Sequence, residues 1–205
     1  MVTRYNIRNV KTVSEILHYL ISNISKEMSY NAVKNIFNVS NAGTIKEYIG
    51  YFENAFLLFS INKFDFSLKK QLINPKKIYA IDSGLANSVS FQFSENLGRQ
   101  LENLVFLHLK RMNFEIFYHS NIFECDFVAR INDKIVMVIQ VTQSIENEQT
   151  RIREIIGLTE AMQMYGLTTG IILTEDEEDE IIKNGVTIIV NLFGNGCLTP
   201  HNRIS

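Results

Sequence analysis

The sequence predicts an α/β protein made of two modules, and three observations support this. At 205 residues, of which 46% are hydrophobic and 20% charged, the chain is long enough for one large core or two small ones. The pattern of apolar residues changes from mainly helical in the first ninety residues to a mixture of strands and helices afterwards. The charge also changes, because residues 1–97 contain 11 lysines and arginines against 7 acids, whereas residues 98–205 contain 9 against 15. We therefore expect one module at residues 1–92 and a second at residues 93–205.

The first module has the element order of a winged helix. Ser29 stands where it can cap a short helix, and an Asn- and Gly-containing turn at 40–43 follows, which together give a helix-turn-helix outline. Strand-forming residues come next and predict a hairpin. The expected helices are residues 12–25, 30–37 and 44–55, and the expected strands are residues 56–62 and 77–81.

The connection between these two strands, residues 63–76, is polar and basic. Lys46, Lys69 and Lys70 are the residues of this module that could contact the phosphates of a nucleic acid. The alternative is that all three belong to an ordinary solvated surface. A charge of +4 over about a hundred residues is weaker than that of most dedicated DNA-binding domains.

The second module predicts a mixed sheet with helices on both faces. Its first helix, residues 98–111, is strongly apolar, and Asn132-Asp133 is a turn signal between two long strands. The remaining expected elements are strands 115–119, 124–131 and 134–143, a helix at 145–165, and strands 170–174 and 186–192. The acidic run 175–180 is interpreted as the solvated start of a helix, where carboxylates favour the helix dipole.

Several motifs of the chain resemble one family when taken together. Glu124-Cys125-Asp126-Phe127-Val128 and the stretch 138–144 (VIQVTQS) resemble a strand pair with the patterns E-V-D-F-V and I-E-V-K-x-S. That pair occurs in the C-terminal region of bacterial and archaeal AAA+ type ATPases, which is similar to PD-(D/E)XK and Holliday-junction-resolvase-like nucleases. Supporting matches are residues 98–106 with G-x-x-x-E-N-x-V-x, residues 82–86 with D-x-G-L, and the winged-helix part from Tyr30 onward. The resemblance covers about residues 12–195.

The resemblance implies a restriction-endonuclease-like sheet and assigns residues to a nuclease site. Glu102 would be the helix carboxylate and Asp126 the main ligand of Mg²⁺, with Glu124 a further carboxylate nearby. Gln140 stands where the second strand acid belongs, and Thr142 stands where the lysine belongs. Loss of a charge weakens the binding of a hard divalent cation, and threonine cannot supply an ammonium group to the reacting phosphate. The implied nuclease site is therefore degenerate.

The favoured function is a non-catalytic module of an AAA+ type ATPase that binds nucleic acid or a partner protein. ATP would bind only in an N-terminal domain outside this chain, because the chain has no G-x-x-x-x-G-K-[ST] motif. One alternative is an Mg²⁺-dependent DNA endonuclease or junction resolvase that uses Glu102 and Asp126 with the amide oxygen of Gln140. The other is a domain that binds only proteins.

The composition predicts a cytoplasmic protein without a membrane segment. No stretch approaches the roughly 18–20 apolar residues of a membrane helix, and the N-terminus has no apolar signal region. Cys125 and Cys197 are too few for a disulfide framework. We expect Cys125 to be a buried, inert thiol.

Overall fold

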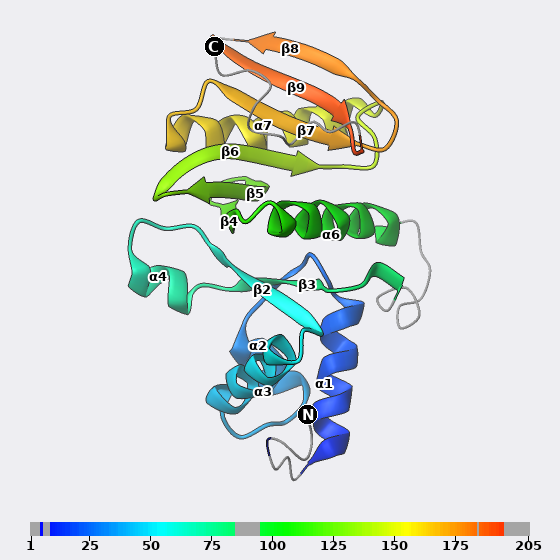
Figure 1. Cartoon of the computed structure of the whole chain (residues 1–205), viewed down its shortest axis with the longest axis vertical. Coiled ribbons are helices and arrows are strands. Elements are labelled where there is room, and N and C mark those ends of the chain that lie inside the picture. The colour runs from blue at the N-terminus through cyan, green and yellow to red at the C-terminus, as the bar shows by residue number, and fades with distance from the viewer. Residues whose placement is uncertain (1–4, 6–8, 85–94, 184, 195–205) are drawn as a thin grey trace. The chain divides into compact units, whose positions relative to one another are not determined.

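The computed structural model describes residues 5, 9–84, 95–183 and 185–194, without the side chains of 95 and 96. The chain divides into two compact units, Met1–Phe93 and Ser94–Ser205, hereafter unit 1 and unit 2. Both combine helices with a sheet, so the α/β class is confirmed (Figure 1). The expected boundary at residues 92 and 93 lies outside the described residues, as do Leu85 and Ala86 at the end of the D-x-G-L tract.

The helices of unit 1 begin at side chains that accept hydrogen bonds from the first turn. Asn9 Oδ1 accepts from the N–H of Thr12, Ser29 Oγ from that of Ala32, and Asn41 Oδ1 from that of Gly43. These caps explain why the third helix begins two residues earlier than expected. The helices are α1 (Val10–Ser22), α2 (Tyr30–Ile36) and α3 (Ala42–Asn54).

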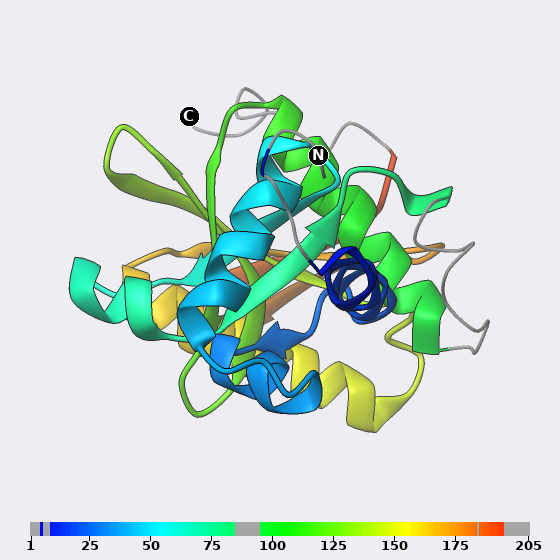
Figure 2. The same ribbon diagram turned by 90° about the horizontal axis from the view of Figure 1, so that it is seen from below.

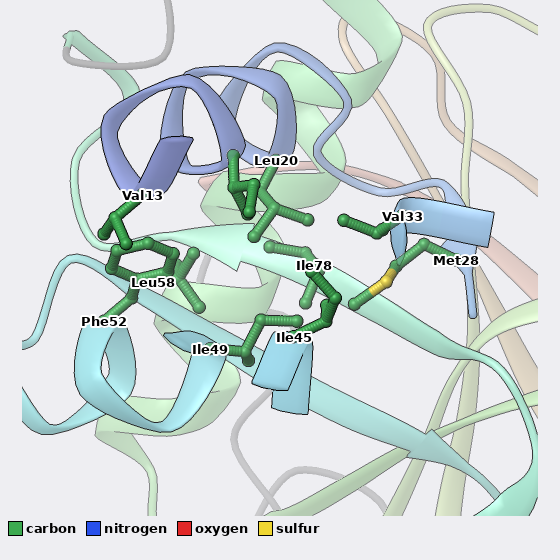
Figure 3. Packing of buried hydrophobic residues seen from close by; sticks show 10 residues of the cluster. Val13, Leu20, Met28, Val33, Ile45, Ile49, Phe52, Leu58 and Ile78 are labelled. Carbon is green, nitrogen blue, oxygen red and sulfur yellow. The ribbon is translucent and has the colours of Figure 1, made fainter. Parts of the chain in front are cut away.

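A three-stranded antiparallel sheet completes unit 1. Its strands lie in the order β1-β3-β2, and the apolar stripes of the helices meet it in one core. Figure 3 shows Leu58 and Ile78 of the sheet facing Leu20 of α1 and Ile49 of α3. The strands are β1 (Glu27–Met28), β2 (Leu58–Lys63) and β3 (Lys76–Ala80).

The connection between β2 and β3 is not the open basic loop expected of a wing. It contains a short helix, α4 (Leu68–Ile73), which carries Lys69 and Lys70. Asp65 Oδ1 accepts from the N–H of Ser67, and the Gln71 side chain donates to the Asp65 carbonyl. These bonds between residues two and six positions apart give the segment its own hydrogen bonding, which a count of basic residues does not reveal.

Unit 2 contains a six-stranded mixed sheet in the order β4-β5-β6-β7-β9-β8. The first three strands are antiparallel, β6, β7 and β9 are parallel, and β8 pairs antiparallel with β9 at the edge. Asn132 and Asp133 both adopt positive φ, so the turn expected between β5 and β6 is confirmed without a glycine. The strands are β4 (Glu115–Ser120), β5 (Glu124–Ile131), β6 (Lys134–Val141), β7 (Thr169–Thr174), β8 (Asp179–Lys183) and β9 (Val186–Leu192).

The acidic run 175–180 does not start a helix, contrary to expectation. Glu177 accepts hydrogen bonds from the Ser144 hydroxyl at 2.6 Å and from the N–H of Ile145 at 2.7 Å. Asp179 pairs with Arg151 at 2.6 Å. These long-range contacts tie the run to α7 and to the segment before it, and the end of the run continues as the edge strand β8.

Two helices, α6 (Glu95–Arg111) and α7 (Glu148–Tyr165), pack on this sheet. Helix α7 begins at Glu148, three residues later than expected, because the Asn147 side chain accepts hydrogen bonds from the N–H groups of Gln149 and Thr150. It approaches β5 very closely at Gly157, where an added Cβ would lie 2.1 Å from the Glu124 carbonyl oxygen. None of the described helices is both long and apolar enough to cross a membrane.

We expect Gly157→Ala to destabilise the protein by about 1–3 kcal/mol, because the methyl group meets backbone and either α7 or β5 must move. Gly50→Ala in α3 is the matched control, since nothing lies within 4 Å of its added Cβ. That substitution should stabilise the protein by about 0.5–1 kcal/mol. Urea denaturation followed by far-UV circular dichroism measures both. Equal effects of the two substitutions would contradict the close approach of α7 to β5.

Candidate functional site

The hairpin of β5 and β6 brings Asp126 and Gln140 together. Both side chains are buried, with exposed fractions of 6% and 7%. The N–H of Asp126 donates to Gln140 Oε1 at 3.1 Å, and the N–H of Val141 donates to Asp126 Oδ2 at 3.0 Å. Each side chain therefore binds the backbone of the neighbouring strand. Asp126 and Gln140 therefore lie next to each other on β5 and β6, as the resemblance implies.

Helix α7 adds a third buried side chain, Glu154, which is 3% exposed. The Gln140 amide nitrogen donates to Glu154 Oε2 at 2.5 Å, and Arg153 Nε donates to Glu154 Oε1 at 3.0 Å. Burial raises the pKa of Glu154 above its ordinary value, although the hydrogen bond and charge of Arg153 oppose this shift. Asp126 raises that pKa further.

Arg153 is a cationic side chain that contacts this group of acids through Glu154. Its hydrogen bond to Glu154 raises the pKa of the guanidinium, and the charges of Glu154, Asp126 and Glu124 act in the same direction. The side chain is 71% exposed, so solvent screens its charge. A cation thus reaches the site from α7, although β6 offers only Thr142 where a lysine would stand.

Thr142 and Glu102 are buried as well, Thr142 directly after the end of β6 and Glu102 on α6. The Thr142 hydroxyl donates to the Ser144 carbonyl at 3.2 Å, so it braces the segment between β6 and α7. Glu102 is 8% exposed on α6, a helix that packs against β4, β5 and β6. Glu124 is exposed at the start of β5, and Cys125 is buried as expected.

The donors around Asp126 do not fit Mg²⁺. This ion takes about six oxygen ligands in a nearly ideal octahedron and needs carboxylates to offset its charge. Gln140 Oε1 already accepts an N–H, and the amide nitrogen rather than an oxygen faces Glu154. Within the described residues, no three His, Cys, Asp or Glu side chains are grouped to hold a metal ion. The Mg²⁺ ligands expected at Glu102 and Asp126 stay a prediction.

Sequence reasoning missed Glu154 and Arg153. The signal that could have found Glu154 is its position on one face of a helix with Gly157, Leu158 and Ala161, all of which are buried. An acid on an apolar helix face needs a partner, because a buried carboxylate without one is costly. Nothing local identifies Gln140, fourteen residues earlier, as that partner.

The candidate nucleic-acid residues of unit 1 lie on two elements. Lys46 is exposed on α3. Burial lowers the pKa of the Lys76 ammonium group, and the charge of the nearby Lys46 lowers it further. Lys69 is exposed on α4, and Lys70 pairs with Asp65 at 3.7 Å. Contact of Lys46, Lys69 and Lys70 with phosphate stays a prediction.

Comparison with known proteins finds similar proteins, but their names state no activity. Residues 2–96, slightly less than half of the chain, match the model of a domain of unknown function, DUF8612. "Uncharacterized protein MJ1544" of Methanocaldococcus jannaschii is 36% identical over 172 residues, which cover 80% of this chain and 37% of that protein. An uncharacterized protein of Haemophilus influenzae is 25% identical over 140 residues, which cover 66% of this chain and 35% of that protein.

The chain thus spans little more than one third of the length of these curated relatives. No solved structure matches. The names of the relatives state neither a substrate nor a partner, so the link to AAA+ type ATPases stays a proposal.

We expect Gln140→Glu to destabilise the protein by about 1–3 kcal/mol, because a second carboxylate would face Glu154 in a buried position. Adding Glu154→Gln should recover at least half of the loss, since an amide again faces a carboxylate. Gln143→Glu is the matched control, because it makes the same chemical change at an exposed position. Urea denaturation of the parent protein, Gln140→Glu, Glu154→Gln, the double variant and the control measures the coupling.

The pH dependence gives a second measure of the same pair. A carboxyl group whose pKa is raised in the folded state contributes stability that is present below its unfolded pKa and is lost as pH rises through the folded value. The loss should therefore begin above the ordinary value of 4.5 for Glu154, be steeper in Gln140→Glu, and be reduced in Glu154→Gln. Parallel pH profiles for these variants would contradict the pairing.

Proposed function

We propose that this chain is a non-catalytic binding module that serves an AAA+ type ATPase and carries a nuclease-like unit without nuclease activity. One observation carries the proposal: both ends of the Gln140 amide are in use, one towards β5 and the other towards α7. The position that would supply the second metal carboxylate instead acts as a hydrogen-bonded link between a strand and a helix.

The charges around this link support the same conclusion. Phosphodiester cleavage assisted by a metal needs carboxylates that hold the ion and a cation directed at the phosphate. Here the guanidinium of Arg153 is bound to Glu154, and Thr142 is bound to the backbone. The groups of the site are satisfied by one another, which is typical of a structural network.

Binding of nucleic acid or of a partner protein is the activity that remains for the module. The exposed Lys46 on α3 supports nucleic acid, because its ammonium group can pair with a phosphate. The link to an ATPase rests on the sequence motifs. The greater length of the relatives leaves room for such a domain in those proteins.

We expect no cleavage of linear or branched DNA by the protein in Mg²⁺ or Mn²⁺, because the donor set around Asp126 does not fit a divalent cation. The assay compares the protein with Asp126→Ala by gel electrophoresis of labelled DNA, and the two should give the same background. Cleavage that Asp126→Ala abolishes would instead establish the alternative, a nuclease that uses Glu102 and Asp126 with Gln140.

If the partner is nucleic acid, affinity should fall steeply with salt concentration, because phosphate contacts release counterions. Lys46→Ala should then weaken binding to all sequences and lower the salt slope by about 1. Lys11→Ala, an exposed change on α1, is the control and should change neither. Fluorescence anisotropy of labelled duplex and single strands measures both quantities. No binding at low salt would remove nucleic acid and leave a partner protein.

A further inference from the structure

Helix α4 and the residues beside it expose an unusual amount of apolar surface. Phe66 is 81% exposed, Leu68 68%, Leu72 56% and Ile73 71%. The helix projects away from β2 and β3 in both views of the ribbon (Figures 1 and 2). Four large apolar side chains exposed within eight residues are typical of an interaction surface. We call this group the α4 face.

The α4 face stands on a firmly held backbone. Asp65 binds Ser67 and Gln71 at the start of the helix. At its end the ammonium group of Lys76, a residue only 5% exposed, donates to the carbonyls of Gln71 and Leu72 at 2.6 and 3.2 Å. A surface that is ordered before binding loses little conformational entropy when a partner arrives. These contacts indicate a docking surface.

The charge of the α4 face is positive. Lys69 is exposed, and Lys70 retains 65% exposure of its side chain in a long pair with Asp65. The apolar side chains on either side of these two lysines gain nothing from hydrated phosphates. A protein surface therefore fits the α4 face better than a nucleic-acid backbone does. The matching surface would combine an apolar centre with carboxylates.

Unit 2 carries such a surface at its edge strand, β8. This strand is the last of its sheet, and Ile182 on it is 74% exposed. The run before and within it is acidic, and Glu175, Asp176, Glu178 and Glu180 are all exposed. Glu177 and Asp179 hold the run in place through Ser144 and Arg151. We call Glu175–Glu180 together with Ile182 the β8 edge.

We propose that the α4 face of one molecule docks on the β8 edge of a second copy of this chain. The two surfaces are complementary in charge, and each has an exposed apolar centre. Because they differ, the contact is head-to-tail, and such contacts build rings or open chains rather than closed dimers. The surfaces are small, and interfaces below about 1,200 Å² are typical of transient complexes. The proposal does not depend on the proposed function.

Sedimentation velocity of the nucleic-acid-free protein at low ionic strength tests the proposal. The sedimentation coefficient should rise with protein concentration beyond that of a dimer and fall again in high salt. Lys69→Glu/Lys70→Glu and Glu175→Lys/Asp176→Lys/Glu178→Lys/Glu180→Lys should each remain monomeric, because the first makes the α4 face negative and the second reverses the sign of the β8 edge, so that like charges meet. An equimolar mixture of these two variants should associate again, since each then offers a surface complementary to the other.

Controls separate the specific contact from net charge and from misfolding. Lys11→Glu/Lys26→Glu changes the net charge equally at exposed positions outside α4 and should associate like the parent protein. Leu72→Ser/Ile73→Ser changes only exposed apolar residues and should weaken association at least tenfold while far-UV circular dichroism is unchanged. A parent protein that is monomeric at all concentrations, or a variant mixture that stays monomeric, would overturn the proposal.

Discussion

The hydrogen bonds of the Gln140 amide are the interaction on which the second unit depends. One end accepts the N–H of Asp126 on β5, and the other donates to the buried Glu154 on α7. A carboxylate at this position could accept the first bond but would repel Glu154. An amide can serve both neighbours, because it carries an acceptor at one end and a donor at the other. Gln140 thus acts as a structural link between a strand and a helix.

The rest of the unit 2 sheet is arranged around this link. Gly157 lets α7 approach β5 closely enough for Glu154, three residues earlier, to reach β6. Glu177, which follows β7 in the sequence, holds the segment between β6 and α7 by binding Ser144 and Ile145. The burial of Glu154 is tolerated because Gln140 and Arg153 satisfy its oxygens. Hydrogen bonds among buried groups thus hold α7 on the sheet of unit 2.

Unit 1 also contains a segment that differs from the element order predicted for it. Its helices and three strands follow the order of a winged helix, but the expected wing contains α4, whose apolar side chains face solvent. A helix of this kind favours a protein partner, whereas the exposed Lys46 on α3 offers a charge that suits phosphate. The unit therefore offers two different surfaces. The acidic β8 edge of unit 2 is complementary in charge to both lysine-bearing surfaces. The α4 face differs from the surface at Lys46 because it also exposes large apolar side chains.

The sequence by itself determined the α/β class and most of the helices and strands, whereas the adjacency of Asp126 and Gln140 was implied by the family resemblance. The class and the elements depend on local signals: apolar periodicity, the cap at Ser29, and a turn at Asn132-Asp133 whose residues tolerate positive φ. Only the tertiary structure decided the roles of Glu154, Arg153, α4 and the acidic run. Glu154 and the acidic run depend on partners distant in sequence, Glu154 on Gln140 and Glu177 on Ser144, and Arg153 takes its role from the burial of Glu154. A local pattern records that a residue can be buried or charged, but the partner that satisfies it is chosen when the elements pack.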